Sequence, residues 1–234
     1  MEELSKNFYE NNYELFSDTR FCLWDVVNNF SQNFKLDSKI LDAGCGNGKN
    51  IKYFNEKCNI IGIDNCNNLV RLCIEKGYNV LYSDIRNTSF SDNYFDYIIC
   101  YKSLLYLNLD KAFKELNRVL KKDGKLIILE NIGDNFIFNY YRYFKHLLIS
   151  KKYASELNKI KIKDFNIAKK YFKCVDSSFF DFFMIFGKFI KDKFRINISH
   201  SFLKSLDKIL LKNLKLYFLA FTVVKIYKKN SDEI

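Results

Sequence analysis

The chain has 234 residues, of which 48% are hydrophobic and 18% aromatic, so it can bury a core in one domain or in one domain with an insertion. The apolar run from Leu216 to Val224 is far shorter than the about 20 residues that a membrane-spanning helix needs. The first residues, MEELSKNFYE, lack the apolar stretch of a secretory signal. We therefore expect a soluble, cytoplasmic protein with no transmembrane segment.

The net charge of +11 is unevenly distributed, because residues 145–234 contain 20 Lys and Arg against 8 Asp and Glu. Such an excess favours an anionic partner, either nucleic acid or a membrane surface. The alternative is a solvated surface in a chain that is rich in Lys, Asn, Ile and Phe throughout. The seven cysteines form no Cys-x-x-Cys pair, so we expect neither a metal site nor a disulfide framework.

Short apolar runs alternate with helical patterns in the first part of the chain. Strands are predicted at residues 39–43, 59–64, 79–84, 95–101 and 125–131. Helices are predicted between them, at residues 47–57, 68–77 and 109–124. Repeated strand–helix–strand units with apolar strands indicate a parallel sheet that helices cover on both faces. Because such crossovers are right-handed, the sheet should be doubly wound.

The pattern changes after residue 131. Helices are predicted at residues 135–150, 164–172 and 184–213, and strands at 173–183 and 214–228. Two late strands separated by helices can form an antiparallel edge on a parallel sheet. The predicted fold class is thus α/β, with a doubly wound, mostly parallel seven-stranded sheet, an antiparallel last strand and helical C-terminal insertions.

A glycine turn follows the first predicted strand, with Gly44, Gly46 and Gly48 at every second position. This spacing matches neither the G-x-G-x-x-G dinucleotide fingerprint nor the Walker loop. Acidic residues stand at the ends of three successive strands, namely Asp42, Asp64 and Asp84. Such acids suit a ligand with ribose hydroxyls, an adenine amine and an ammonium but no phosphate. S-adenosylmethionine has that description.

Five motifs in order resemble the class I S-adenosylmethionine-dependent methyltransferases, which are Rossmann-like. The motifs are residues 41–48, 62–64, 83–84, 95–96 and 120–126. The resemblance implies a helical N-terminal segment (1–34), a cofactor-binding core (35–131), and a substrate-covering region with the last strands (132–234). It also implies a cofactor site built from Asp42, Gly44, Cys45, Gly46, Gly48, Asp64, Asn65, Asp84, Ile85, Cys100 and Tyr101.

A narrower resemblance covers the first half of the chain. Residues 16–20, followed by Trp24 and Val27, resemble a segment of the eukaryotic tRNA wobble-uridine carboxymethyl methyltransferases. This resemblance implies that Arg20 lies near the reaction centre, although a surface salt bridge is an equal alternative. It also implies tRNA and a small zinc-binding activator protein as partners. The family's His-His pair is replaced by Leu105-Tyr106, and we take Tyr106 as a second catalytic candidate.

Two functions remain open at this point. A carboxylate nucleophile needs no general base, because it is ionised at neutral pH. Methyl transfer to the carboxymethyl group of a tRNA wobble uridine therefore suits a site with an arginine and no histidine. The alternative is methylation of a small-molecule, lipid or glycan-precursor substrate, since residues 130–228 look more like bacterial enzymes of that kind.

Overall fold

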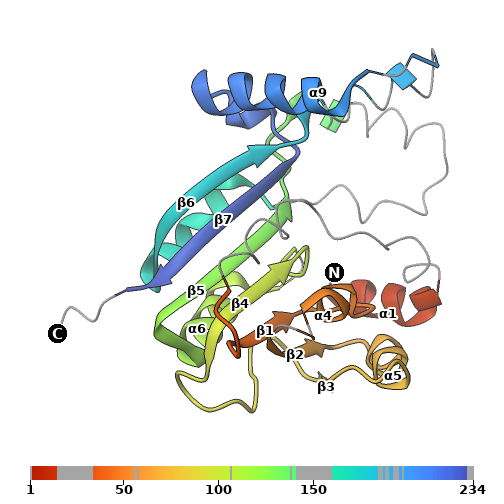
Figure 1. Cartoon of the computed structure of the whole chain (residues 1–234), viewed down its shortest axis with the longest axis vertical. Coiled ribbons are helices and arrows are strands. Elements are labelled where there is room, and N and C mark those ends of the chain that lie inside the picture. Colours follow the sequence, from red (N-terminus) through yellow and green to blue (C-terminus); the bar gives the residue numbers. More distant parts are fainter. Residues whose placement is uncertain are drawn as a thin grey trace. The chain divides into compact units, whose positions relative to one another are not determined.

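The computed structural model describes residues 2–14, 34–54, 56, 58–105, 107–137, 139–140, 160–183, 187, 190–191, 195–196 and 198–230 (Figure 1). Seven strands form one sheet in the order β3-β2-β1-β4-β5-β7-β6. The strands are β1 (Lys39–Ala43), β2 (Asn59–Asp64), β3 (Val80–Tyr82), β4 (Phe95–Tyr101), β5 (Leu120–Asn131), β6 (Phe172–Phe180) and β7 (Thr222–Lys229). The α-helices are α1 (Glu2–Asn11), α4 (Lys49–Phe54), α5 (Asn67–Glu75), α6 (Leu109–Val119) and α9 (His200–Asp207). The remaining helices are the 3-10 helices η2 (Ile162–Lys170) and η4 (Tyr217–Leu219) and the π-helix η3 (Lys208–Asn213).

Strand β1 lies at the centre of the parallel part of the sheet. It pairs in parallel with β2 and β4, so that Ile40 stands opposite both Ile60 and Tyr97. Four of its five residues are buried, as expected for a strand covered on both faces. The chain runs from β1 outward to β2 and β3 and returns to β4 on the other side, so the strand order reverses at β1. Ligands of doubly wound sheets bind beyond the carboxyl ends of the strands at such a reversal.

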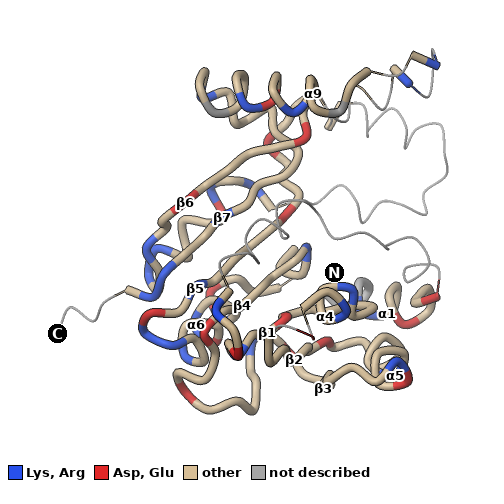
Figure 2. Tube along the Cα trace, viewed as in Figure 1, with Lys and Arg blue, Asp and Glu red and all other residues tan. Residues whose placement is uncertain are grey.

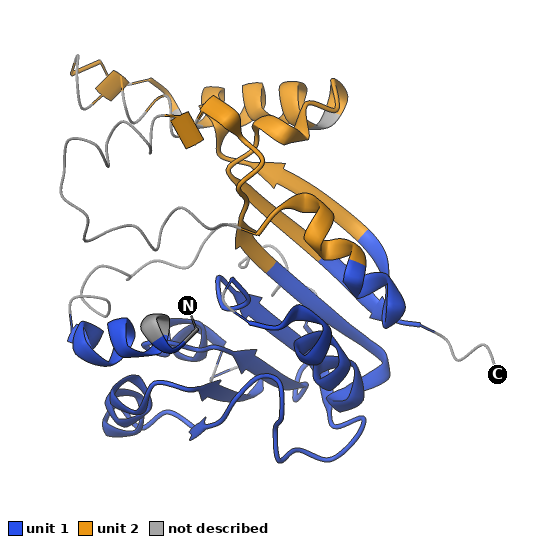
Figure 3. Ribbon diagram, turned by 180° about the vertical axis from the view of Figure 1, so that it is seen from behind, with its two compact units in different colours: residues 1–128, 167–175, 226–234 blue, residues 129–166, 176–225 orange. Residues whose placement is uncertain are grey.

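The chain forms two compact units (Figure 3). The first unit comprises residues 1–128, 167–175 and 226–234, and it contains the glycine turn and strands β1 to β4. The second comprises residues 129–166 and 176–225, and it contains α9, η3 and η4. All of the cofactor-site residues predicted from the sequence therefore belong to the first unit.

The last strand, β7, runs antiparallel to β5, as predicted. Within the second unit, the backbone N–H of Ile132, just after β5, donates to the carbonyl oxygen of Phe221, just before β7 (2.8 Å). Within the first unit, Lys229 at the end of β7 donates its ammonium to the carbonyl oxygen of Leu120, the first residue of β5 (3.1 Å). The start of each strand thus lies beside the end of the other, as in an antiparallel pair.

Helix α6 ends earlier than the sequence predicts. The amphipathic pattern predicted a helix as far as Gly124, but the helix stops at Val119 and β5 begins at once. The backbone N–H groups of Asn93 and Tyr94 donate to the carbonyl oxygens of Arg118 (2.9 Å) and Val119 (2.8 Å). A longer helix would need both carbonyls for its own hydrogen bonds, so this loop ends it.

Other predicted boundaries also shift. The third strand is confined to β3, and the last strand begins at Thr222 rather than at residue 214, because η4 occupies residues 217–219. Parts of the predicted helices 135–150 and 184–213 lie outside the described residues. Within the described ranges, no helix is long and apolar enough to cross a membrane, and no three His, Cys, Asp or Glu residues are placed to hold a metal ion.

Candidate cofactor site

The glycine turn links β1 to α4 and is fixed against the end of β2. The backbone N–H groups of Gly44 and Cys45 both donate to the carbonyl oxygen of Ile63, at 2.8 and 2.9 Å. Gly44, Gly46 and Gly48 have φ angles of 79°, 55° and 75°, in the left-handed region that favours glycine. The turn therefore needs glycine for its conformation, and it presents backbone rather than side chains at the carboxyl end of β1.

Two of these glycines are also required by the space around them. A Cβ on Gly44 would lie 2.3 Å from Cβ of Ser103 and 3.6 Å from Cδ1 of Ile85. A Cβ on Gly48 would lie 2.6 Å from the ring of Tyr78. The fold thus brings Ile85, a predicted site residue, against the turn. It adds Ser103, which the sequence argument did not identify.

Asp42 is fully buried at the end of β1. Its Oδ1 accepts a hydrogen bond from the side-chain amide of Asn50 (3.0 Å), whereas its Oδ2 has no partner among the described residues. Burial raises the pKa of Asp42 to about 7, which the hydrogen bond from Asn50 opposes and the charge of Asp64 supports. A carboxyl group in this setting gains from a ligand that donates hydrogen bonds or carries a positive charge.

Asp64 ends β2 and is bound to the glycine turn. Its Oδ2 accepts from the backbone N–H of Gly46 (2.9 Å) and its Oδ1 from that of Cys66 (3.0 Å). Burial raises the pKa of Asp64, against hydrogen bonds from the backbone of Gly46, Cys66 and Asn65. Carboxylate oxygens accept more than one hydrogen bond each, so capacity remains for the ribose hydroxyls expected there. Asn65 joins the site through its backbone.

Asp84, beyond β3, has a strong partner that the sequence argument did not foresee. Its Oδ1 accepts from the backbone N–H of Arg86 (2.8 Å) and from Nε of the same residue (2.9 Å), and its Oδ2 accepts from Nη2. The hydrogen bond from Arg86 lowers the pKa of Asp84. An adenine amine at this position would therefore share the carboxylate with Arg86.

The end of β4 supplies the other predicted contacts. Cys100 is fully buried, and Tyr101 follows it at the carboxyl end of the strand. The ammonium of Lys49 lies 3.9 Å from the centre of the Tyr101 ring, and that of Lys102 lies 5.5 Å from it. Because Lys49 begins α4, the cation–π contact joins the end of β4 to the glycine turn.

Two thiols lie beneath the turn. Cys73 on α5 donates its thiol to the carbonyl oxygen of Gly46 (3.3 Å), and Cys45 is also buried. The hydrogen bond with Cys73, together with burial, raises the pKa of Cys45 well above its ordinary value. Both cysteines are free thiols. Because Cys45 is buried and the pKa of its thiol is raised, we expect it to pack in the turn and not to act as a nucleophile.

A carboxylate on α1 binds the start of α5, which is far away in the sequence. Glu10 accepts from the backbone N–H groups of Asn67 (2.7 Å) and Asn68 (3.2 Å), and so it caps α5. Lys6 donates to the phenol oxygen of Tyr82 at the end of β3 (2.9 Å). The N-terminal helix is thereby held close to the residues that follow Asp64.

The two catalytic candidates, Arg20 and Tyr106, lie outside the described residues. The structure brings together Asp42, Cys45, Asp64, Ile85, Tyr101 and the three glycines around one turn. It adds Asn50, Ser103 and Glu10. A local signal existed for Asn50, which directly follows the Gly48-Lys49 pair, but Ser103 and Glu10 reach the site only through tertiary folding.

These residues fit S-adenosylmethionine. Asp42 offers a buried oxygen that lacks a hydrogen-bond partner among the described residues. The side-chain oxygens of Asn50 and Ser103 are also buried without such a partner. A Cβ on Gly44 or Gly48 would clash with Ser103 or Tyr78, so the turn can pack in this way only with glycine at these two positions. Acceptors for an ammonium and for ribose hydroxyls thus surround a turn that a ligand can approach closely.

Part of the chain is similar to known methyltransferases. Residues 41–128 match the family model described as "Methyltransferase domain". The chain is 36% identical over 134 residues to the tRNA (carboxymethyluridine(34)-5-O)-methyltransferase of Arabidopsis thaliana, a match that covers 54% of this chain and 33% of that protein. It is 35% identical over 124 residues to the "Probable tRNA methyltransferase 9B" of Mus musculus, covering 51% and 28%. The chain thus spans about a third of the length of these relatives.

Solved structures with little sequence identity share the whole fold. A SAM-dependent methyltransferase from Archaeoglobus fulgidus superposes with a TM-score of 0.61 at 18% identity, covering 95% of this chain and 98% of that one. A chain in the complex of the Haloferax volcanii Trm112 methyltransferase activator with a methyltransferase has a TM-score of 0.61 at 10% identity, covering 97% and 98%. Residues 41–128 therefore match a methyltransferase domain, and the chain has the class I methyltransferase fold.

Proposed function

We propose that the protein transfers the methyl group of S-adenosylmethionine to the carboxylate of a carboxymethyl group on a tRNA wobble uridine. The observation that carries the proposal is the 36% identity, over 134 residues, to an enzyme named for this reaction. That match covers 54% of this chain and 33% of the relative. The substrate and the activity of the whole protein are therefore part of the proposal.

The chemistry of the site supports an ionised nucleophile. The cofactor supplies an electrophilic methyl group on a sulfonium. A carboxylate oxygen forms the new O–C bond while the C–S bond breaks, and no proton moves. Among the acids around the glycine turn, Asp64 accepts from backbone N–H groups and Asp84 from Arg86, and we assign Asp42 to the ammonium of the cofactor, so that no acid is assigned as a base for the substrate. A hydroxyl or ammonium nucleophile would need a base, whereas a carboxylate does not.

Arg20 and Tyr106 are assigned to the substrate in this proposal. A guanidinium forms paired hydrogen bonds with a carboxylate, so Arg20 would orient the carboxymethyl group for in-line attack. Tyr106, which stands in the Leu105-Tyr106 pair, would line the pocket for the base. Residues 132–234 are assigned to substrate binding as part of the same proposal.

One of the solved structures that share the fold is a complex with a methyltransferase activator, the Trm112 protein of Haloferax volcanii. We propose that a small zinc-binding activator protein covers the edge of the sheet at β3. Leu81 and Tyr82 are 44% and 50% exposed on that edge strand, and Ile74 on the neighbouring helix α5 is 56% exposed. Exposed apolar residues on an edge strand are a common site for strand addition by a partner.

The test compares two RNAs and two variants. Labelled S-adenosylmethionine would be offered with an anticodon stem-loop that carries carboxymethyluridine and with the same stem-loop carrying uridine. We expect label in the first RNA only, released by mild alkali as an ester is. Arg20→Ala should reduce the rate by about 100-fold, whereas Arg71→Ala, at an exposed position on α5, should leave it unchanged. Equal labelling of both RNAs, or label that survives alkali, would contradict the proposal.

A further inference from the structure

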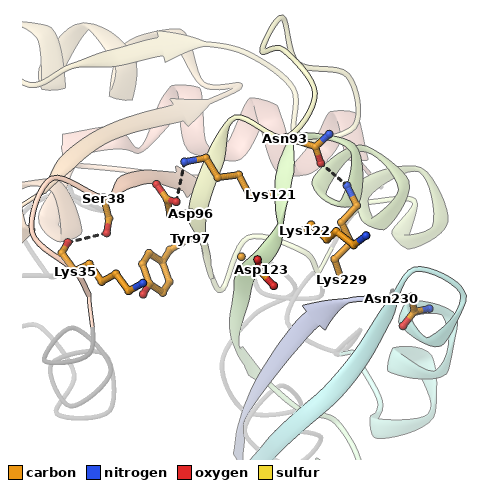
Figure 4. A pocket seen from close by; sticks show the side chains of 11 residues that line it. Lys35, Ser38, Asn93, Asp96, Tyr97, Lys121, Lys122, Asp123, Lys229 and Asn230 are labelled. Atoms are coloured by element: carbon orange, nitrogen blue, oxygen red, sulfur yellow. Dashed lines mark hydrogen bonds and ion pairs between the residues drawn. The ribbon is translucent and has the colours of Figure 1, made fainter. Parts of the chain in front are cut away.

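A cavity lies at the amino ends of the parallel strands, at the opposite end of β1 from the glycine turn (Figure 4). Its volume is about 560 Å³, and it is formed where β1, β4 and β5 begin and where the antiparallel β7 ends. All of its lining residues belong to the first compact unit. Strand β1 has five residues, so the cavity and the glycine turn are separated by about 17 Å. This cavity therefore cannot be the cofactor site.

Lysine side chains dominate the charge of the cavity. Lys35, Lys121, Lys122 and Lys229 line it, together with the carboxylates of Asp96 and Asp123. Figure 4 shows Lys35 on one side, beside Tyr97, and Lys122 and Lys229 on the other. The four ammonium groups against two carboxylates leave a net positive charge.

Internal contacts neutralise only part of that charge. Lys121 is paired with Asp96 (2.8 Å). Burial would raise the pKa of Asp96, but hydrogen bonds from Lys121 and from the backbone of Lys39 lower it, so the carboxylate stays ionised. Lys229 donates to the side-chain oxygen of Asn93 (2.8 Å), a neutral partner. Among the described residues, no ion pair involves Lys35 or Lys122, both of which are exposed.

The basic surface continues beyond the cavity within the same unit. Asn230, which lines the cavity, donates its side-chain amide to the carbonyl oxygen of Lys169 (3.3 Å). Beyond the cavity, Lys169 and Lys170 end η2 and Lys173 lies at the start of β6, where Figure 2 shows blue segments. Lys170 is paired with Asp110 (3.0 Å), whereas Lys169 is exposed. A linear anion would meet several ammonium groups in succession.

We propose that this cavity binds a phosphate group of an RNA strand and so acts as a second anchor for the RNA substrate. The inference rests on the proposed function, because it assumes an RNA substrate. Lysine ammonium groups bind phosphate as point charges, and contacts to the backbone position a nucleic acid without reading its sequence. An RNA bound there would be anchored about 17 Å, the length of the five-residue β1, from the glycine turn.

The experiment uses the full chain and an anticodon stem-loop RNA labelled with a fluorophore. Binding is measured by anisotropy at several salt concentrations for the wild type, for Lys35→Gln/Lys122→Gln, and for Lys111→Gln/Lys114→Gln. The last pair removes the same charge from exposed positions on α6. We expect the cavity variant to raise Kd about 3- to 10-fold and to reduce the slope of log Kd against log salt by about 1.4 to 1.8. The α6 variant should change Kd less than about twofold.

Equal Kd values and salt slopes for the two variants would overturn the proposal, as would a wild type that binds no RNA. Adenosine monophosphate is titrated in parallel. Binding of the mononucleotide that depends on Lys35 and Lys122 but does not compete with RNA would also overturn it, in favour of a free nucleotide. RNA binding that requires these lysines, in a protein that does not methylate RNA, would support the cavity while contradicting the proposed function.

Discussion

The side-chain amide of Asn50 donates to Oδ1 of the buried Asp42 at 3.0 Å. This contact fixes the carboxyl at the end of β1 and leaves Oδ2 without a partner among the described residues. Since a buried acceptor without a donor is costly, the pair is prepared for a ligand that supplies hydrogen-bond donors. In the proposed site that ligand group is the ammonium of the cofactor's amino acid.

Replacement of this carboxyl should separate cofactor binding from stability. Asp42→Asn keeps the shape but removes the charge, so we expect affinity for S-adenosylhomocysteine to fall by about 10-fold or more, measured by calorimetry. The melting temperature should stay the same or rise, because the substitution removes a buried carboxylate that lacks a full set of hydrogen-bond partners and therefore destabilises the fold. Asp37→Asn, at an exposed position, is the control. Unchanged affinity in Asp42→Asn would exclude Asp42 from the cofactor site.

The pH dependence of the unliganded protein follows from the same residue. The pKa of Asp42 is about 7 in the folded chain and 3.8 as the reference value. Between these values the folded state binds more protons, so the contribution of Asp42 to stability decreases as pH rises from about 4 to 7. A cationic ligand reverses the preference by favouring the ionised carboxylate.

Cofactor affinity should therefore increase as the pH rises to about 7, and binding of the cofactor should release a proton. Calorimetry in two buffers with different ionisation enthalpies measures this release directly. Asp42→Asn should abolish it. Proton release that is equal in the wild type and the variant would mean that another group titrates on binding.

Two glycines with nearly the same φ angle allow the effect of crowding around the turn to be measured. Gly48 and Gly77 have φ angles of 75° and 76°, but a Cβ on Gly48 would meet Tyr78 at 2.6 Å, whereas a Cβ on Gly77 would have nothing within 4 Å. Gly77→Ala should cost about 1 to 2 kcal/mol of unfolding free energy, and Gly48→Ala clearly more.

Denaturant unfolding measures both costs. The double variant Gly48→Ala/Tyr78→Ala should recover part of the extra loss, because the ring that opposes the new methyl group is removed. If Gly48→Ala and Gly77→Ala cost the same, crowding by Tyr78 plays no part.

The cap of α5 by Glu10 gives a third test. Burial would raise the pKa of Glu10, but hydrogen bonds from the backbone of Asn67 and Asn68 lower it. Its stabilising effect is therefore present above the ordinary pKa of a glutamate and is lost as pH falls through the lower folded value. Glu10→Ala should speed hydrogen exchange at residues 67–70, whereas Glu3→Ala, at an exposed position of α1, should not. Equal exchange in both variants would show that Glu10 does not cap α5 in solution.

Much of the fold could be predicted because its signals are local. Strands β1, β2 and β4 are short apolar runs between turns, and the glycine spacing with Asp42 and Asp64 indicates both the turn and its ligand. The end of α6 could not be predicted, since the carbonyls of Arg118 and Val119 are taken by a loop. Glu10 and Asn67 are 57 residues apart, and the ion pair of Arg86 with Asp84 depends on the side-chain conformation of Arg86. Such contacts leave no periodic pattern.

The most direct test of the central claim is transfer of labelled methyl from S-adenosylmethionine, in parallel, to bulk tRNA and to an extract of small molecules and lipids from the same cells. We expect label in tRNA, located at the wobble position and released by mild alkali. Label confined to the extract would contradict the RNA substrate and would support a small-molecule or lipid acceptor on the same methyltransferase domain.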